Sequence, residues 1–329
     1  MEIYDAFKQL GTLRNSVVIV FTTCDKGVHY PIGHEHYPCF VRQLIEISKH
    51  YPNKKIPKIS LILNTLGGNL PAARSIALLI KEFSEKFEVI IPHYAFSAGT
   101  LISLYADNII MLEGASLGPI DPSVSDFKYP NMPANSAAQL EAELIKSSIN
   151  PEIKVTSLET MTSFYDPVII GQTIRAQKQI AKFIEEAISS KINQIQFKNA
   201  INFLTRDTVF HKQKISIKEI NEKISIKAKD AKNDEKILIS EIFNYAQKKM
   251  NIIDNSFFEK TEYKNCMIQV ESKRFIISSI EGGTDFLSHV ITLTYNTNYN
   301  EKKPLSEENP KFIKNPTHEW YEQKFEKFL

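Results

Sequence analysis

Two neighbouring stretches decide the fold: residues 59–83 read ISLILNTLGGNLPAARSIALLIKEF, and residues 88–106 read EVIIPHYAFSAGTLISLYA. Each begins with a short run of apolar, mostly β-branched residues, which is typical of a buried strand. Each then passes through a turn that contains glycine and continues as an apolar segment long enough for a helix. We therefore predict two consecutive strand–turn–helix units in this part of the chain.

The flanking sequence extends the same alternation. Further strands are predicted at 16–22 and 109–112. The segment 38–50, which lies between the strand at 16–22 and the one that begins at 59, has the helical spacing of apolar residues. Strands that alternate with helices of this length form βαβ units. The sequence thus predicts a mostly parallel sheet that is covered on both faces.

The second half of the chain is less regular. Prolines recur through residues 123–166, which we interpret as an excursion or lid between core elements. Regularly spaced isoleucines then predict a long helix at 167–189. The Lys-rich segment 228–236 (AKDAKNDEK) is expected to be a solvated loop or linker. The remaining expected elements are helices at 191–204 and 237–250, and strands at 266–280 and 289–296 that flank a hairpin turn at Gly282-Gly283.

The composition is that of an ordinary globular chain. Of 329 residues, 43% are apolar and 24% are charged, and the formal net charge is +2. This balance requires neither a nucleic acid nor an anionic membrane as a partner. Three scattered cysteines form no disulfide framework, and the N-terminal MEIYDAFKQL lacks the pattern of a signal peptide. Residues 89–112 contain no uninterrupted run of about 18 apolar residues. We expect a cytoplasmic protein that does not associate with membranes.

The two glycine-containing turns carry the candidate chemistry. The Gly-Gly turn (residues 64–69, NTLGGN) joins a strand to a helix N-terminus, whose unpaired N–H groups suit an oxyanion. The serine turn (residues 94–100, YAFSAGT) repeats this geometry and places Ser97 where its hydroxyl and the next N–H can face the same point. Taken singly, a Gly-Gly turn is usually only a turn, and a serine before a helix is usually an N-cap.

In this order and spacing, the two turns resemble the Clp/crotonase superfamily. Within it they resemble the serine dehydrogenase proteinase family, which is related to signal peptide peptidase A and to the caseinolytic Clp protease. The resemblance rests on three motifs within residues 59–122 and extends more weakly to 167–189 and 204–220, whereas the tail from about residue 250 has no counterpart. The motifs are LILNTLGGNLPAARSIALLI, VIIPHYAFSAGTLISLYADNIIM and LGPIDP.

The resemblance implies an α/β protein with a Clp/crotonase-like fold of repeated ββα units. An α-helical extension and a small C-terminal α+β region would complete it. We expect a serine peptidase domain at 1–225, with residues 123–166 as its lid or excursion. Residues 226–329 would form a C-terminal extension that can act as an interaction region for a protein partner.

The resemblance further implies a serine endopeptidase that hydrolyses polypeptide substrates through an acyl-enzyme, without ATP and without a cofactor. Ser97 matches the nucleophile of the family. Gly68 and Ala98 match the positions whose N–H groups form the oxyanion hole, which is coherent with acyl transfer. Members of the family assemble into rings, so we expect a homo-oligomer.

The general base has two sets of candidates. His211 falls in a segment similar to the downstream histidine motif of the family, and Asp121 of GPIDP would orient it. Alternatively, Lys146 or Lys154 would form a Ser–Lys dyad, which requires burial to lower the pKa of the lysine. Of the two, we predict His211 with Asp121 and keep the lysines as the alternative.

Two other functions stay open. A crotonase-type acyl-CoA enzyme shares the fold and the oxyanion hole but needs no nucleophilic serine. A non-catalytic scaffold would keep the fold and bind other proteins through the tail. A metal site is not expected, because the spacing of the histidines and cysteines near the N-terminus fits no usual zinc pattern. These residues are Cys24, His29, His34, His36 and Cys39.

Overall fold

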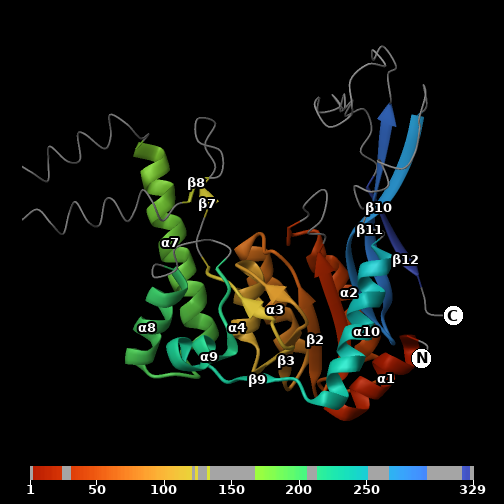
Figure 1. The fold of residues 1–329 in the computed structure, drawn as a ribbon, viewed down its shortest axis with the longest axis horizontal. Coiled ribbons are helices and arrows are strands. Elements are labelled where there is room, and N and C mark those ends of the chain that lie inside the picture. The colour runs from red at the N-terminus through yellow and green to blue at the C-terminus, as the bar shows by residue number, and fades with distance from the viewer. Residues whose placement is uncertain are drawn as a thin grey trace, which may run out of the picture.

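An eight-stranded mixed sheet organises the described part of the chain (Figure 1). The computed structural model describes residues 3–23, 31–120, 123–124, 132–133, 167–205, 213–250, 267–294 and 321–326. The strand order is β12-β11-β10-β1-β2-β3-β5-β9. The parallel strands are β1 (Val17–Thr23), β2 (Ile59–Asn64), β3 (Phe87–Ile91), β5 (Asn108–Met111) and β9 (Ala228–Asp230).

The sheet continues beyond β1 with antiparallel strands from the C-terminal part of the chain. These are β10 (Met267–Ser279), β11 (Gly283–Thr294) and β12 (Tyr321–Glu326). The predicted hairpin is thereby confirmed. Strands from both sides of the expected boundary at 225/226 share one sheet, and the division into two domains stays a prediction. Two small sheets pair β4 (Tyr94–Ala95) with β6 (Ser116–Leu117), and β7 (Ser123–Val124) with β8 (Met132–Pro133).

The parallel strands bury side chains on both faces, as predicted. In β1, Val17, Ile19 and Phe21 belong to one apolar cluster, whereas Val18 and Val20 belong to another. The first cluster packs under α2 (His36–Ser48), α3 (Leu70–Phe83), α4 (Ala98–Tyr105), α7 (Pro167–Ile188) and α8 (Gln194–Thr205). The second packs under α1 (Ile3–Arg14) and α10 (Asn233–Lys249).

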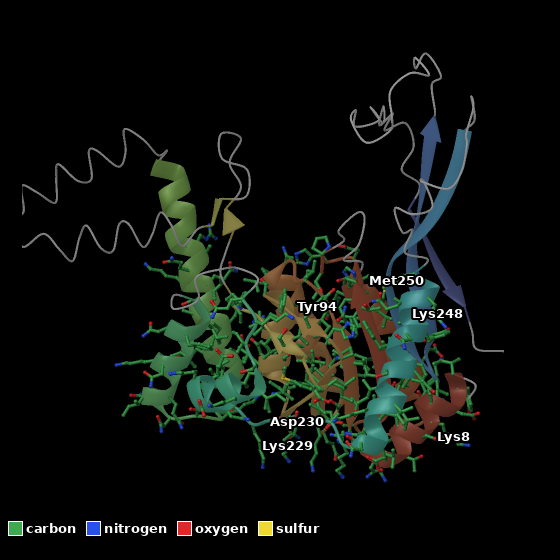
Figure 2. The ribbon with its side chains drawn as sticks, viewed as in Figure 1. Lys8, Tyr94, Lys229, Asp230, Lys248 and Met250 are labelled. Atoms are coloured by element: carbon green, nitrogen blue, oxygen red, sulfur yellow. The ribbon has the colours of Figure 1, made fainter. Side chains whose placement is uncertain are left out.

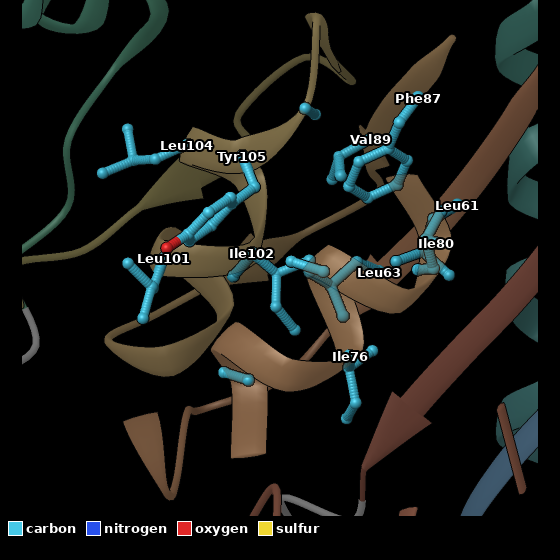
Figure 3. Close-up of a cluster of buried hydrophobic side chains, with 14 of the residues drawn as sticks. Leu61, Leu63, Ile76, Ile80, Phe87, Val89, Leu101, Ile102, Leu104 and Tyr105 are labelled. Carbon is cyan, nitrogen blue, oxygen red and sulfur yellow. The ribbon is translucent and has the colours of Figure 1, made fainter. Parts of the chain in front are cut away.

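The centre of the larger cluster lies between strands β2 and β3 and helices α3 and α4 (Figure 3). Leu61 and Leu63 of β2 pack there with Ile76 of α3 and Ile102 of α4, all fully buried. The two helices that follow the predicted turns are therefore fixed to the same region of the sheet. Between α8 and β9 lie the short helix α9 (Ile217–Glu219) and a π-helical turn at Ile220–Ile224.

The prediction of a solvated loop at 228–236 is wrong. Ala228–Asp230 forms β9, which pairs with β5, and α10 begins at Asn233. Ala228 is buried, whereas Lys229 and Asp230 project outward (Figure 2). A short strand with charged side chains is a usual form for a sheet edge, because it discourages pairing with other chains. The charges that indicated a loop are those of an edge strand.

Buried charges connect the sheet to the two helices on its second face. Glu88 of β3, about 1% exposed, accepts hydrogen bonds from Arg14 Nε (2.9 Å) and from Ser60 Oγ (2.5 Å), and it pairs with Lys58 Nζ (2.9 Å). Arg14 also bonds Glu235 of α10 (2.9 Å). Burial alone would raise the pKa of Glu88, but the hydrogen bonds from Arg14, Ser60 and Lys58 lower it below its usual value.

Several predictions concern residues outside the described ranges. The lid or excursion at 123–166 is described only at β7 and β8, so its role stays a prediction.

Among the described residues, no helix combines the length and the apolar character that crossing a membrane would require.

Candidate active site

The Gly-Gly turn and the serine turn lie against each other at the carboxyl ends of β2 and β3. Thr65 N–H donates to Tyr94 O (3.1 Å), and Phe96 N–H donates to Thr65 O (3.0 Å). A Cβ atom added to Gly67 would lie only 2.8 Å from the Cβ of Ser97. Glycine at 67, with a φ of +113°, is therefore what allows the two turns to approach so closely.

Ser97 stands in a strained backbone conformation at the N-terminus of α4. Its φ is 49° and its ψ is −108°, which a residue with a Cβ rarely adopts and which costs about 1–3 kcal/mol. Although Ser97 occupies the N-cap position, its side chain makes no capping hydrogen bond. The side chain is about 6% exposed, and within the described residues its hydroxyl bonds no other group. The structure thus does not support the N-cap interpretation of this serine.

Two backbone N–H groups beside Ser97 are held in fixed orientations. Ile32 N–H donates to Gly67 O and Asn69 N–H donates to Ile32 O, both at 2.8 Å, which is the pattern of a parallel bridge between Ile32 and Gly68. The carbonyl of Gly67 and the N–H of Gly68 belong to one trans peptide group and point in opposite directions. The N–H of Gly68 therefore points away from Ile32.

The second N–H belongs to Ala98. Its peptide group is fixed by the first helical hydrogen bond of α4, in which Leu101 N–H donates to Ser97 O (3.0 Å). Within the described structure, neither Ala98 N–H nor Gly68 N–H donates to a protein group. Two N–H donors and a hydroxyl that lack a partner among the described residues are thus concentrated where the two turns meet. Acyl transfer requires this combination of groups.

Residues next to the Gly-Gly turn form the N-terminus of α3. Asn69 caps α3, because its Oδ1 accepts from Ala72 N–H (2.8 Å), and Pro71 follows in the first turn, where a missing N–H is harmless. Gly68, with a φ of +147°, lies so close to Ile32 that an added Cβ would be 2.4 Å from its backbone N and O. Both glycines are therefore required, Gly67 because it faces Ser97 and Gly68 because it faces Ile32.

None of the four candidate bases is placed by the structure. Asp121, His211, Lys146 and Lys154 all lie outside the described residues, so their roles stay predictions. His93, beside the serine turn, is exposed and packs edge-on against Phe243, with 4.9 Å between the ring centroids.

A lysine that the sequence did not single out has a lowered pKa. Burial lowers the pKa of Lys191 to about 8. Its Nζ donates to Leu104 O (2.6 Å) and Ala106 O (2.5 Å) at the C-terminal end of α4. Ser97 stands at the other end of this eight-residue helix, about 12 Å away along the axis. Lys191 therefore caps α4 and does not reach the candidate nucleophile.

The N-terminal histidines and cysteines gather no metal site in the described structure. His36 begins α2, and its ring is buried beside Phe21, with 5.2 Å between the centroids. Burial lowers the pKa of His36. No group of three or more His, Cys, Asp or Glu residues that could hold a metal ion is found in the described ranges, which do not include Cys24 and His29.

Solved structures with a similar chain path include two proteases. A mutant form of the 1510-N membrane-bound stomatin-specific protease, in complex with a substrate peptide, has a TM-score of 0.40 and 21% identity, and the match covers 67% of this chain and 78% of that chain. For a ClpP1 mutant from Listeria monocytogenes the TM-score is 0.40 and the identity 16%, and the match covers 69% of this chain and 99% of that chain.

Two proteins of uncharacterised function from Methanocaldococcus jannaschii are similar in sequence. One is 35% identical over 164 residues, which are 50% of this chain and 50% of the relative. The other is 29% identical over 222 residues, or 65% of this chain and 69% of the relative. The chain thus spans about half the length of the first relative.

The family model of ClpP-like SDH-type serine proteinases matches residues 42–265. This range contains both turns and more than half of the 329 residues. It also confirms the resemblance that the motifs of residues 59–122 carry. The chain therefore belongs to the family of ClpP-like SDH-type serine proteinases.

Proposed function

We propose that the chain is a serine endopeptidase that cleaves polypeptides through an acyl-enzyme on Ser97. The observation that carries the proposal is the meeting of the two turns. Ser97, whose backbone is strained and whose side chain makes no capping bond, stands beside Gly67, and among the described residues the N–H groups of Gly68 and Ala98 have no protein partner. Membership of a serine proteinase family supports this assignment.

In the proposed reaction, Ser97 Oγ attacks the carbonyl carbon of the peptide while a general base takes its proton. The N–H groups of Gly68 and Ala98 would stabilise the oxyanion, and each such donor typically contributes about 100–1,000-fold in rate. Collapse of the intermediate releases the amine, which receives the proton, and water then hydrolyses the ester on Ser97. Peptide hydrolysis consumes no nucleotide, which is why we propose that the reaction is independent of ATP.

For the base, we propose His211 oriented by Asp121, and we keep Lys146 and Lys154 as the alternative. The two arrangements differ in pH dependence, because an imidazole titrates near neutrality and a lysine acts only if its pKa is strongly lowered. Replacing each residue by alanine and measuring activity between pH 5 and 10 would distinguish them.

We further propose that the protein works as a homo-oligomer in the cytoplasm, and that residues 226–329 contribute a surface for a protein partner. Sedimentation of the full chain tests the assembly, and Ile237→Lys, which changes an exposed apolar side chain of α10, tests the contribution of this region.

The central test is covalent labelling with a fluorophosphonate probe. We expect labelling of the wild type, loss of labelling in Ser97→Ala, and unchanged labelling in Ser116→Ala. Ser116 is a matched control, because its buried hydroxyl makes no hydrogen bond in the described structure. Cleavage of an unfolded polypeptide such as casein, with and without ATP, should follow the same pattern in the three proteins.

Other outcomes identify the alternative functions. Equal labelling of the wild type and Ser97→Ala would refute Ser97 as the nucleophile. Turnover of acyl-CoA that survives in Ser97→Ala would indicate a crotonase-type enzyme. A wild type that neither labels nor cleaves, and that copurifies with a stable partner, would indicate a scaffold.

A further inference from the structure

Thr65 connects the two turns of the candidate site through its backbone. It is the first residue after β2 and is fully buried. Its N–H and C=O are both bonded to the serine turn, to Tyr94 O at 3.1 Å and to Phe96 N–H at 3.0 Å. The segment that leads to Ser97 is therefore attached directly to Thr65.

The side chain of Thr65 contacts the Gly-Gly turn and the start of α4. Its Oγ1 accepts a hydrogen bond from Gly67 N–H (3.1 Å) and another from Thr23 Oγ1 (2.8 Å). Its methyl group lies over Gly99, where an added Cβ would be only 2.5 Å from Thr65 Cγ2. The hydroxyl and the methyl group thus contact two different parts of the site.

The hydroxyl restrains the residue that has the most conformational freedom. Gly67 is bonded on both sides, through its N–H to Thr65 Oγ1 and through its C=O to Ile32 N–H. Without the first bond, only the bond from Ile32 N–H would oppose a rotation of the Gly67 backbone, because glycine has no Cβ to limit its dihedral angles. Such a rotation would turn the following peptide group, which carries the N–H of Gly68.

We propose that Thr65 is a positioning residue, whose hydroxyl holds Gly67 so that the N–H of Gly68 keeps its direction relative to Ser97. The inference rests on the proposed function, because it assigns Gly68 to the oxyanion hole. Thr65 itself reaches the reaction only through the backbone of Gly67. A misplacement of about 1 Å can lower a rate by about 100-fold, so a single anchor of this kind is enough to affect catalysis.

Two substitutions separate the hydroxyl from the methyl group. Thr65→Val keeps the shape and removes the hydrogen bonds, whereas Thr65→Ser keeps the hydroxyl and removes the methyl group. Thr23→Val serves as a matched control, since it removes the bond between the two hydroxyls but leaves the bond from Gly67 N–H in place. All variants are compared by thermal unfolding, so that rates are measured only on folded protein.

The first readout is the rate of fluorophosphonate labelling of Ser97 as a function of probe concentration. For Thr65→Val we expect the maximal rate to fall about 10- to 100-fold, with little change in the concentration that gives the half-maximal rate. For Thr65→Ser and Thr23→Val we expect rates within about 3-fold of the wild type. A role limited to packing predicts the opposite order, because serine leaves a gap over Gly99 that valine fills.

The second readout does not depend on catalysis. Amide hydrogen exchange of Gly67, measured by NMR, should be slow in the wild type and in Thr65→Ser, and at least 10-fold faster in Thr65→Val. If Thr65→Val does not fold, Thr65→Cys replaces it, because a thiol resembles serine in shape but is a weaker acceptor.

The outcomes distinguish this inference from the proposed function. A wild type without labelling would refute the proposed function, while the exchange of Gly67 still reports whether Thr65 holds the turn. Equal labelling rates in the wild type and Thr65→Val, or equal exchange of Gly67, would overturn the positioning role. An equal loss of labelling in Thr65→Ser and Thr65→Val would do the same, since the hydroxyl would not be its cause.

Discussion

Replacing Ser97 with glycine should stabilise the protein and at the same time abolish its labelling. The backbone at Ser97, with φ 49° and ψ −108°, lies in a region that glycine adopts without strain. Serine and alanine both carry a Cβ, so Ser97→Ala should keep the strain. We therefore expect Ser97→Gly to be more stable than Ser97→Ala, and Ser97→Ala to resemble the wild type.

The expected size of the effect follows from three contributions. Relief of the strain is worth about 1–3 kcal/mol. Against it, the greater freedom of glycine in the unfolded chain costs about 0.5–1 kcal/mol, and the loss of a buried methylene costs about 0.8 kcal/mol. The hydroxyl contributes little, since it bonds no described group. Where the strain is near the upper part of its range, a net stabilisation of about 1 kcal/mol results.

Differential scanning calorimetry of the three proteins measures this difference. For a chain of 329 residues, 1 kcal/mol corresponds to a rise of roughly 1–2 °C in the unfolding midpoint. Ser103→Gly is the matched control, because Ser103 lies inside α4, where glycine should lower the midpoint. A midpoint for Ser97→Gly below that of Ser97→Ala would refute the expected stabilisation, because it would limit the strain at Ser97 to less than the roughly 1.3–1.8 kcal/mol that the other two contributions cost.

Three further outcomes are expected. Gly67→Ala should lose labelling by 100-fold or more, since its Cβ would lie 2.8 Å from the Cβ of Ser97 and force the turns apart, and fluorophosphonate labelling of the folded variant checks this. Glu88→Gln should lower the free energy of unfolding at pH 7 by about 3 kcal/mol, the lower end of the range for a broken buried pair, because the partly buried Arg14 keeps Glu235 as a partner. Since the pKa of Glu88 is lowered in the folded state, its contribution is present above pH 4.5 and is lost as the pH falls below that value, so urea unfolding should show less acid sensitivity in the variant. The pKa of Lys191 falls from 10.5 to about 8 on folding, so the unfolded state binds more protons between pH 8 and 10. The stability of the wild type relative to Lys191→Met should therefore rise from pH 8 to 10. Urea unfolding measures this difference, and a difference that does not change with pH would contradict the lowered pKa.

The elements around the site were predictable because their signals are local. The apolar run of β2, the Asn69 cap and the proline of α3 stand next to one another in the sequence, and the strand–turn–helix unit predicted within 59–83 is observed, with α3 ending at Phe83. The prediction for 228–236 is wrong because the strand that pairs with β9 is β5, which is far away in the chain. The residues of a short edge strand do not indicate which distant strand it will pair with.

The motif at the site was visible in the sequence, but its geometry was not. Ser97 and Gly68 stand out through their neighbours, whereas the unusual dihedral angles of Ser97 and its missing cap appear only in the structure. Thr65 was not singled out, because its hydroxyl partner Thr23 and its steric partner Gly99 are separated from it by long stretches of chain. A threonine before two glycines has no meaning of its own until these contacts are known.

The pairing of β10 with β1 has a consequence for shortened forms of the protein. The family match ends at residue 265, yet Val20 to Thr23 are paired with residues 275–278. A chain that begins at residue 1 and is cut at residue 265 would leave the end of β1 as an open edge, able to recruit strands from other molecules. That edge ends at Thr23, the neighbour of Thr65. Aggregation and a loosening of the candidate site would then arise from the same cut, although no residue of the two turns had been removed.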